Sequence, residues 1–392
     1  MAEKYRIKTR DEHFTSDGPK RILALDGGGL KGIVTLGFLQ QIEDTLRDRH
    51  GASADFRLAH YFDLIAGTST GAIIAAALAT GMTVSEVTQY YLTMGEKVFN
   101  PDWFRKGILR ARYDDRKLRA LLKDVLGADT TLGDPSLSTG LLVVTKRMDT
   151  GSPWPLSNNP RGQYFSGSEV KQRVGNADYP LWQVVRASTA APAFFDPETL
   201  IINEGGSRRQ AVRGSFVDGG VTPFNNPALQ AFMYATLDGY RVNWSTGADQ
   251  LLIVSIGTGS ADPEHKPSKI AAKGAVKALL SMMDDCAQLV ETMMQLMSAG
   301  TKVKHIDREL GDLRGDLISP APLFSYARYN VSFQPDAVNR LKPGLPEKTI
   351  QSLSSMDETS NLLIWKELGE LAASEQVEDI DFPHKFDLRP EQ

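Results

Sequence analysis

The chain has 392 residues, of which 41% are hydrophobic and 23% charged, as is ordinary for a globular protein with a large buried core. Its formal net charge is −4 and its basic residues are scattered, which argues against binding of a nucleic acid polymer by phosphate neutralisation. Cys286 is the only cysteine, so an internal disulfide bond is excluded.

Two segments and the single cysteine bear on the cellular location of the protein. The first 20 residues are charged and lack the apolar segment of a secretory signal. The most apolar stretch, 64–82, is interrupted by Gly, Thr and Ser, whereas a membrane span needs about 20 continuous apolar residues. Together with the single cysteine, these features lead us to expect a cytoplasmic protein.

The first half of the chain alternates strands and helices. After a polar arm at 1–20, RILALDGGG reads as a strand that stops at glycines, and apolar residues at helical spacing predict a helix over 32–49. HYFDLIAG is a second strand, followed by a helix in GAIIAAALATG. A third helix begins after Thr83, with Glu86 three residues later in a capping-box pattern.

The later elements continue the alternation. Strands are predicted in GLLVVTKRMD, GSFVDGG and QLLIVSIGTGS, and helices in 181–195 (ending near Pro192), 269–300 and 354–373. Strands that alternate with helices favour a mostly parallel sheet covered on both faces. We expect one folded unit that comprises the arm (1–20), a core (21–260), and a helical and mixed C-terminal extension (261–392) packed on that core.

The pentapeptide Gly67-Thr68-Ser69-Thr70-Gly71 fits the pattern G-x-S-x-G between a strand and a helix. The glycines permit a tight turn that lifts the Ser69 hydroxyl above the carboxyl end of the sheet, and the helix start favours negative charge there. The alternative is a plain turn in which Ser69 caps the helix. The strand-to-helix setting favours the nucleophile.

A nucleophilic serine needs a base. Of the six histidines, only His265 lies in a loop that follows a strand, whereas His60 precedes the strand that leads to Ser69 and so belongs at the opposite edge. Asp218 ends a strand and is followed by Gly219 and Gly220, which allow a close backbone approach. Asp218 is therefore the favoured base, although Asp-Gly pairs also form ordinary turns.

The stretch DGGGLKG, 26–32, follows the first strand and opens the first helix. Gly27, Gly29 and Gly32 fit G-x-G-x-x-G, a pattern that often binds dinucleotides, but the next strand ends without the acidic residue that such a site needs. The other use of such a loop is to aim backbone N–H groups at a developing oxyanion. A serine on the neighbouring strand makes that use the better interpretation.

The pieces DGGGLKG (26–32), GTSTG (67–71) and DGG (218–220), together with ASTAAPAFF (187–195), resemble the patatin-like phospholipase family over about residues 21–259. The resemblance implies an α/β fold, with a three-layer core in which helices flank a central, mostly parallel sheet. It also implies hydrolysis of acyl esters of glycerophospholipids at a membrane surface, here the inner face, without a cofactor or catalytic metal. Lys31 stands where the family more often has arginine.

The resemblance also implies roles for individual residues. Ser69 and Asp218 would form a catalytic dyad, and Gly27, Gly28 and Gly29 would supply the oxyanion donors. The remaining motif glycines are Gly32, Gly67, Gly71, Gly219 and Gly220.

The overall layout is further similar to bacterial phospholipase effectors of antiviral defence that cyclic oligonucleotides activate. This similarity implies a cyclic nucleotide activator, although the sequence contains no motif for one. The oligomeric state is left open, with a homodimer as one option. Two rival functions also stay open, namely an esterase that uses His265 and a non-catalytic protein that binds lipid or a nucleotide on the same fold.

Three segments are candidates for lipid contact. The methionine-rich helix predicted over 269–300 would either line an acyl cleft or pack on the core. Lys269, Lys273 and Lys277 would form a basic stripe that faces headgroups or solvent. The segment 100–113, with Trp103 and Phe104 among basic residues, would contact the membrane or form a lid.

Overall fold

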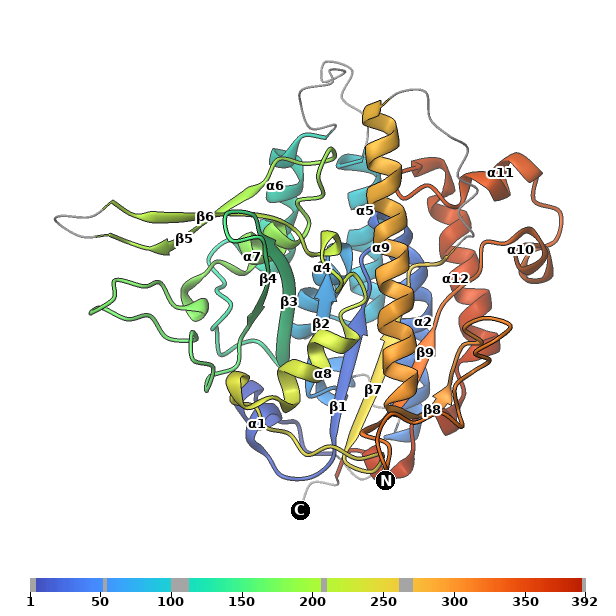
Figure 1. Ribbon diagram of the computed structural model, residues 1–392, viewed down its shortest axis with the longest axis horizontal. Coiled ribbons are helices and arrows are strands. Elements are labelled where there is room, and N and C mark those ends of the chain that lie inside the picture. The colour runs from blue at the N-terminus through green and yellow to red at the C-terminus, as the bar shows by residue number, and fades with distance from the viewer. Residues whose placement is uncertain (1–4, 52–54, 100–112, 206–209, 261–270, 390–392) are drawn as a thin grey trace.

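The computed structural model describes residues 5–51, 55–99, 113–205, 210–260 and 271–389, the side chains of 271–280 excepted. These residues form one sheet with helices on both faces (Figure 1). The strands are β1 (Lys20–Leu25), β2 (Leu64–Thr68), β3 (Gly140–Arg147), β4 (Ser152–Ser157), β5 (Glu198–Asn203), β6 (Val212–Asp218), β7 (Leu251–Ile256), β8 (Ser298–Lys302) and β9 (Phe324–Tyr329).

The strand order is β5-β6-β3-β2-β1-β7-β9-β8, and β4 also pairs with β3. All neighbours from β3 to β8 in this order run parallel, whereas β4, β5 and β6 form antiparallel pairs at one side. The predicted mostly parallel sheet is therefore confirmed. The order brings the carboxyl ends of β1 and β2 side by side, because Leu25 is in register with Gly67.

The helices are α1 (Arg10–Thr15), α2 (Gly32–Arg49), α3 (Leu58–Tyr61), α4 (Thr70–Ala79), α5 (Val84–Lys97), α6 (Asp115–Leu126), α7 (Leu181–Ser188), α8 (Ala228–Thr236), α9 (Ala271–Leu296), α10 (Pro335–Leu341), α11 (Glu347–Ser352) and α12 (Leu362–Gln376). Leu23 and Leu25 of β1 face one hydrophobic core with α2, α4 and α5, while Ile22 and Ala24 face another with α8 and α9. The three layers that we expected are thus present (Figure 1).

Several boundaries differ from the prediction. The helix over 32–49 and the Thr83 cap are as predicted, with the Thr83 side chain accepting the Glu86 N–H. However, α7 ends at Ser188 rather than near Pro192, and α12 begins at Leu362 rather than near residue 354. Strands β4 and β5 were not predicted.

The segments outside the predicted core are packed against it. In the N-terminal segment, α1 buries His13 and Phe14. The C-terminal extension adds β9 and β8 to the sheet beyond β7. The division at residues 20 and 260 stays a prediction.

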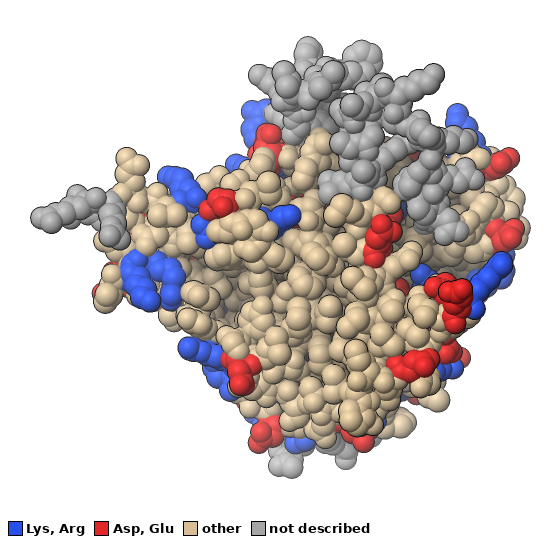
Figure 2. Space-filling model, in the orientation of Figure 1, with Lys and Arg blue, Asp and Glu red and all other residues tan. Residues whose placement is uncertain are grey.

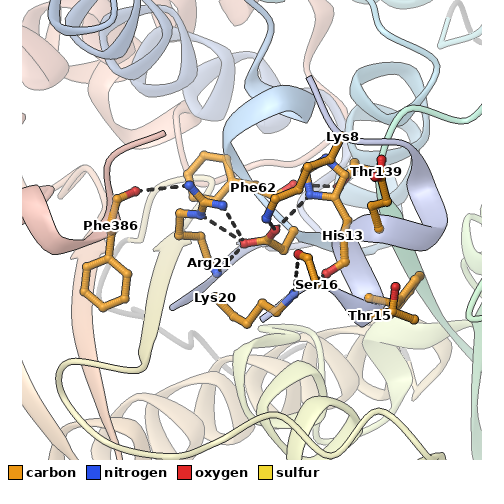
Figure 3. Close-up of polar contacts among 12 residues, drawn as sticks. Lys8, His13, Thr15, Ser16, Lys20, Arg21, Phe62, Thr139 and Phe386 are labelled. Atoms are coloured by element: carbon orange, nitrogen blue, oxygen red, sulfur yellow. Dashed lines mark hydrogen bonds and ion pairs between the residues drawn. The ribbon is translucent and has the colours of Figure 1, made fainter. Parts of the chain in front are cut away.

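The amino ends of β1 and β2 carry a buried ionic group, which we call the Asp63 cluster: Lys8, His13, Arg21 and Asp63 (Figure 3). Asp63 Oδ1 accepts from Lys8 Nζ and His13 Nδ1, each at 2.9 Å, and Oδ2 accepts from Arg21 Nε at 3.0 Å. Burial alone would raise the pKa of Asp63, but Arg21, with His13 and Lys8, outweighs burial and holds the pKa well below its usual range. The cluster ties the N-terminal segment to the sheet.

Candidate active site

Ser69 stands in the turn between β2 and α4. Its φ of 55° and ψ of −126° are rare for a non-glycine residue and cost about 1–3 kcal/mol. A Cβ on Gly67 would lie 2.4 Å from the carbonyl oxygen of Gly71, and a Cβ on Gly71 would lie 2.2 Å from that of Leu25. Only glycine fits at both positions, so the turn holds Ser69 at the end of the sheet in the strained conformation.

The backbone of Ser69 is fixed from a neighbouring element. Its N–H donates to Ser188 Oγ at 2.9 Å, and the Ser188 hydroxyl donates to the carbonyl oxygen of Val144 at 2.6 Å. Ser188 ends α7 and belongs to the segment ASTAAPAFF. That segment carries part of the family resemblance, but the role of Ser188 was not predicted.

Asp218, at the end of β6, lies against Ser69. The Ser69 hydroxyl donates to Asp218 Oδ2 at 2.5 Å, and Asp218 Oδ1 accepts the Gly220 N–H at 2.7 Å. Burial of the carboxylate raises its pKa to about 6, against the lowering effect of these two hydrogen bonds. A Cβ on Gly219 would lie 2.2 Å from the carbonyl oxygen of Val144, so the close approach of this turn requires glycine.

None of the five histidines that the structure describes lines the cavity that contains Ser69. His60 lies in α3, before β2, and its Nδ1 is 3.0 Å from the hydroxyl of Tyr5. It is therefore at the opposite edge of the sheet, as the sequence predicts. His265, the other candidate base, lies outside the described residues.

The glycine loop 27–29 also borders Ser69. The Gly27 N–H donates to the carbonyl oxygen of Asn225 at 3.2 Å, and the Gly28 N–H donates to Thr70 Oγ1 at 3.3 Å. Gly29 has a φ of 60°, and its Cβ would lie 2.5 Å from the carbonyl oxygen of Met356. The N–H groups of Gly27 and Gly28 thus already have acceptors in this structure, and the oxyanion role of Gly27, Gly28 and Gly29 stays a prediction.

Distant parts of the chain hold this loop. The Leu30 N–H donates to the carbonyl oxygen of Met356 at 2.8 Å, and the Tyr91 hydroxyl donates to the carbonyl oxygen of Gly29. Arg328 of β9 binds Asp26 with both terminal nitrogens, at 3.0 and 2.6 Å, and both side chains are buried. The C-terminal extension therefore supports the loop that the sequence predicts as the oxyanion site.

A mainly apolar cavity that opens to solvent contains Ser69 and Asp218 in its wall. The rest of the wall is mainly hydrophobic. The polar members of the wall are Ser69, Thr70, Thr189, Asp218, Asn225, Asp357 and the glycine loop, and its larger hydrophobic side chains are Ile73, Met94, Phe99, Leu118, Phe194, Phe195, Val221, Met283 and Met356. Such a wall suits an acyl chain.

The methionines of α9 have two kinds of surroundings. Met283 lines the cavity, whereas Met294, and Met297 directly after the helix, are buried in the core that α8 and α9 share. The segment 100–112 and Lys269 lie outside the described residues, as do the side chains of Lys273 and Lys277, so their predicted lipid contacts stay predictions.

In the described part of the chain, no helix is both long and apolar enough to cross a bilayer. The same residues include no group of three His, Cys, Asp or Glu side chains that could hold a metal ion. On the face shown in Figure 2, Lys and Arg side chains lie at scattered points among Asp and Glu rather than in one broad basic area.

Comparison with known proteins places these features in context. The family model described as Patatin-like phospholipase matches residues 23–232. A cGAMP-activated phospholipase of Escherichia coli (strain TW11681) is 28% identical over 262 residues, which cover 66% of this chain and 67% of that protein. Patatin-17 of Solanum cardiophyllum is 28% identical over 295 residues, which cover 71% and 72% of the two chains.

Among solved structures, human GIVD cytosolic phospholipase A2 aligns with a TM-score of 0.44 and 11% identity, over 95% of this chain and 61% of that one.

Proposed function

Because this chain belongs to the patatin-like phospholipase family, we propose that it hydrolyses acyl esters of glycerophospholipids with Ser69 as nucleophile and Asp218 as base. The observation that carries the proposal is the 2.5 Å hydrogen bond from the Ser69 hydroxyl to Asp218 Oδ2 at the wall of an apolar cavity. A hydroxyl in contact with a buried carboxylate has a proton acceptor in place before substrate binds.

In the proposed reaction, Ser69 Oγ attacks the acyl carbon as Asp218 Oδ2 takes the hydroxyl proton. The carbonyl oxygen becomes an oxyanion, and the tetrahedral intermediate then expels the alcohol, which takes the proton from Asp218. The products of this half are an acyl-enzyme and a lysophospholipid. With a pKa of about 6, Asp218 is mostly ionised at neutral pH yet basic enough to accept a proton.

The developing oxyanion needs donors. We assign Gly28 and Gly29, because the Gly27 N–H binds a backbone carbonyl oxygen, that of Asn225, whereas the acceptor of the Gly28 N–H is the side-chain hydroxyl of Thr70, which can rotate. Helix α4, which begins at Thr70, adds the positive end of its dipole next to Ser69. Removal of one oxyanion donor typically costs about 3 kcal/mol of transition-state stabilisation.

We propose that the hydrophobic side chains of the cavity wall, among them Ile73 and Met356, hold the acyl chain. Burial of a chain there contributes about 0.8 kcal/mol for each CH₂ group that leaves water. The lining offers few groups for a charged headgroup, so we place the headgroup at the mouth.

The first test is reaction with a fluorophosphonate probe, mapped by mass spectrometry, on the wild type, Ser69→Ala and Asp218→Asn. We expect the label on Ser69 of the wild type and none at this position in Ser69→Ala, with very slow labelling of Asp218→Asn. Release of fatty acid from phosphatidylcholine and phosphatidylglycerol vesicles is measured in parallel. A folded wild type that neither takes the label nor releases fatty acid would contradict the proposal and favour a lipid-binding protein without activity.

A nucleotide activator is a second proposal. It is supported by the relatives from Escherichia coli and Vibrio cholerae, which carry the name cGAMP-activated phospholipase. The probe and vesicle assays are therefore repeated with cGAMP and other cyclic dinucleotides. Faster labelling with one nucleotide would support activation, and equal labelling with all and with none would contradict it.

A further inference from the structure

Asn225 is a buried polar residue of the cavity wall, and the mechanism above does not use its side chain. It is 8% exposed and lies between the turn after Asp218 and helix α8. Its Nδ2 donates to the carbonyl oxygen of Gly27 at 3.2 Å. Within the described part of the chain, its Oδ1 has no hydrogen-bond partner. A buried acceptor without a donor is unfavourable, so this oxygen is a place for a donor that the described residues do not supply.

The orientation of the amide follows from its neighbours. If the amide were rotated by half a turn, Oδ1 would face the carbonyl oxygen of Gly27 and the bond from Nδ2 would be replaced by a repulsion between two oxygens. The contact with Gly27 therefore leaves Oδ1 as the atom that faces away from the loop.

The space around two glycines shows where Oδ1 lies. A Cβ on Gly27 would lie 2.5 Å from Asn225 Oδ1 and 2.9 Å from Ser69 Cβ. A Cβ on Gly220 would lie 2.9 Å from Asn225 Oδ1 and 3.0 Å from Asp218 Oδ1, which puts these two oxygens at most about 6 Å apart. A water that donates a hydrogen bond of about 2.8 Å to each of two acceptors spans about 4.5 Å, a separation that this upper bound allows.

We propose that Asn225 Oδ1 holds the water that hydrolyses the acyl-enzyme. The inference rests on the proposed function of Ser69 and Asp218. The water donates one hydrogen to the Asp218 carboxylate and the other to Asn225 Oδ1, which directs an oxygen lone pair at the acyl carbon next to Ser69. This arrangement gives the unpartnered oxygen its donor and gives the second half of the reaction an oriented nucleophile.

The step balances without a further reactant. The water oxygen bonds to the acyl carbon as Asp218 takes one water proton, and the carbonyl oxygen becomes an oxyanion. The bond between the acyl carbon and Ser69 Oγ then breaks, and the proton on Asp218 passes to Ser69 Oγ. A free fatty acid and the original enzyme result.

Water and alcohols differ in this arrangement. Water has two hydrogens, one for each acceptor, whereas an alcohol has only the one that Asp218 takes. Asn225 therefore assists hydrolysis of the acyl-enzyme but not its transfer to an alcohol. The distinction separates this role from simple support of the Gly27 backbone, which would act on both reactions alike.

The test is the partition of the acyl-enzyme between water and methanol, with p-nitrophenyl butyrate as the acyl donor. We compare the wild type, Asn225→Ala, which loses both side-chain contacts, and Asn225→Asp, which keeps an oxygen at Oδ1. The ratio of methyl ester to free acid is measured, together with the rate at which a fluorophosphonate labels Ser69. The ratio reports only on acyl-enzyme that has formed, so it can be read even when part of a variant is misfolded.

For Asn225→Ala we expect the ratio of methyl ester to acid to rise about tenfold, which corresponds to the loss of one hydrogen bond to the attacking water. For Asn225→Asp we expect a ratio near that of the wild type, with slower labelling because the contact with Gly27 is lost. A ratio that stays unchanged in Asn225→Ala, while labelling slows, would overturn the inference and leave Asn225 as a support for Gly27. A wild type that never labels would instead overturn the proposed function itself.

Discussion

Asp218 and Asp63 are both buried carboxylates at the ends of strands of the same sheet, yet their surroundings are opposite. Asp63, at the amino end of β2, binds Lys8, His13 and Arg21. Asp218, at the carboxyl end of β6, accepts hydrogen bonds from the Ser69 hydroxyl and the Gly220 N–H. Among the described residues, no cation forms an ion pair with it.

The difference shows that partners, not burial, decide what a carboxylate can do. Arg21, together with His13 and Lys8, holds the pKa of Asp63 well below its usual range despite burial. This carboxylate therefore stays ionised and stabilises the fold. Desolvation without a cation in contact raises the pKa of Asp218 to about 6, so this carboxylate can gain and lose a proton near neutral pH. Under the proposed function, the carboxylate at one end of the sheet has a structural role and the one at the other end is the base of the reaction.

The largest expected effect is on activity. Asp218→Asn removes the base and should lower kcat/KM for ester hydrolysis by at least about 10³-fold. Its thermal unfolding at pH 7 should be unchanged or shifted upward, because a carboxylate with a raised pKa destabilises the fold at pH values above the unfolded pKa of about 4. Ester hydrolysis and differential scanning calorimetry check the two parts, and a large loss of stability would contradict the comparison.

The counterpart at the other end is Asp63→Asn. It leaves the buried Arg21 without its counter-charge and removes the carboxylate oxygen that binds the buried His13, so we expect a loss of about 3–5 kcal/mol in the free energy of unfolding. Urea unfolding at pH 7 measures this loss. The fluorophosphonate labelling rate of the fraction that remains folded should match the wild type, whereas slow labelling of folded protein would show that the two ends are coupled.

The pH dependence separates the two carboxylates within the wild type. Below pH about 6, kcat/KM should fall about tenfold per pH unit as Asp218 gains a proton, with a plateau above. The stability that Asp63 contributes is present above its unfolded pKa of about 4 and is lost only as the pH falls further. At pH 5, circular dichroism should therefore show a folded protein, whereas the ester hydrolysis assay should show low activity. An activity profile that is flat between pH 5 and 7 would exclude Asp218 as the base.

The smallest effect is expected for Lys8→Met. The Lys8 ammonium binds Asp63 Oδ1 at 2.9 Å but is 20% exposed, and His13 and Arg21 still bind Asp63 without it. We expect a loss of at most about 1 kcal/mol in the urea unfolding experiment. A loss as large as that of Asp63→Asn would mean that Lys8, rather than Arg21, is the main partner.

The sequence predicts best what is decided locally. Helix α2 has the predicted bounds, and α5 begins at the predicted cap, because apolar spacing and the Thr83–Glu86 pair act within a few residues. The motifs single out Ser69 and Asp218, and the two side chains are in contact. Parallel pairing does not explain that contact, because β6 runs antiparallel to β3 and Asp218 lies opposite Thr145 near the carboxyl end of β3.

Other features depend on partners far along the chain. Strand β4 contains Pro153 and Pro155, which argue against a strand, and pairing with β3 outweighs that preference. Met356 reaches the glycine loop from the C-terminal extension, and Ser188 fixes Ser69 from α7. No periodicity or motif in the sequence encodes these contacts, because each depends on how the elements pack.

Because β7 pairs with β9, the sheet cannot be completed during synthesis until β9 has been made. Leu252–Ile256 pair in parallel with Ser325–Tyr329, and Arg328 of β9 neutralises the buried Asp26 beside the glycine loop. At 5–20 residues per second, the ribosome adds β9 about 4 to 15 seconds after β7. During that interval the nascent chain has an open strand edge and an uncompensated carboxylate, so the half that contains Ser69 is complete only when the later half has emerged.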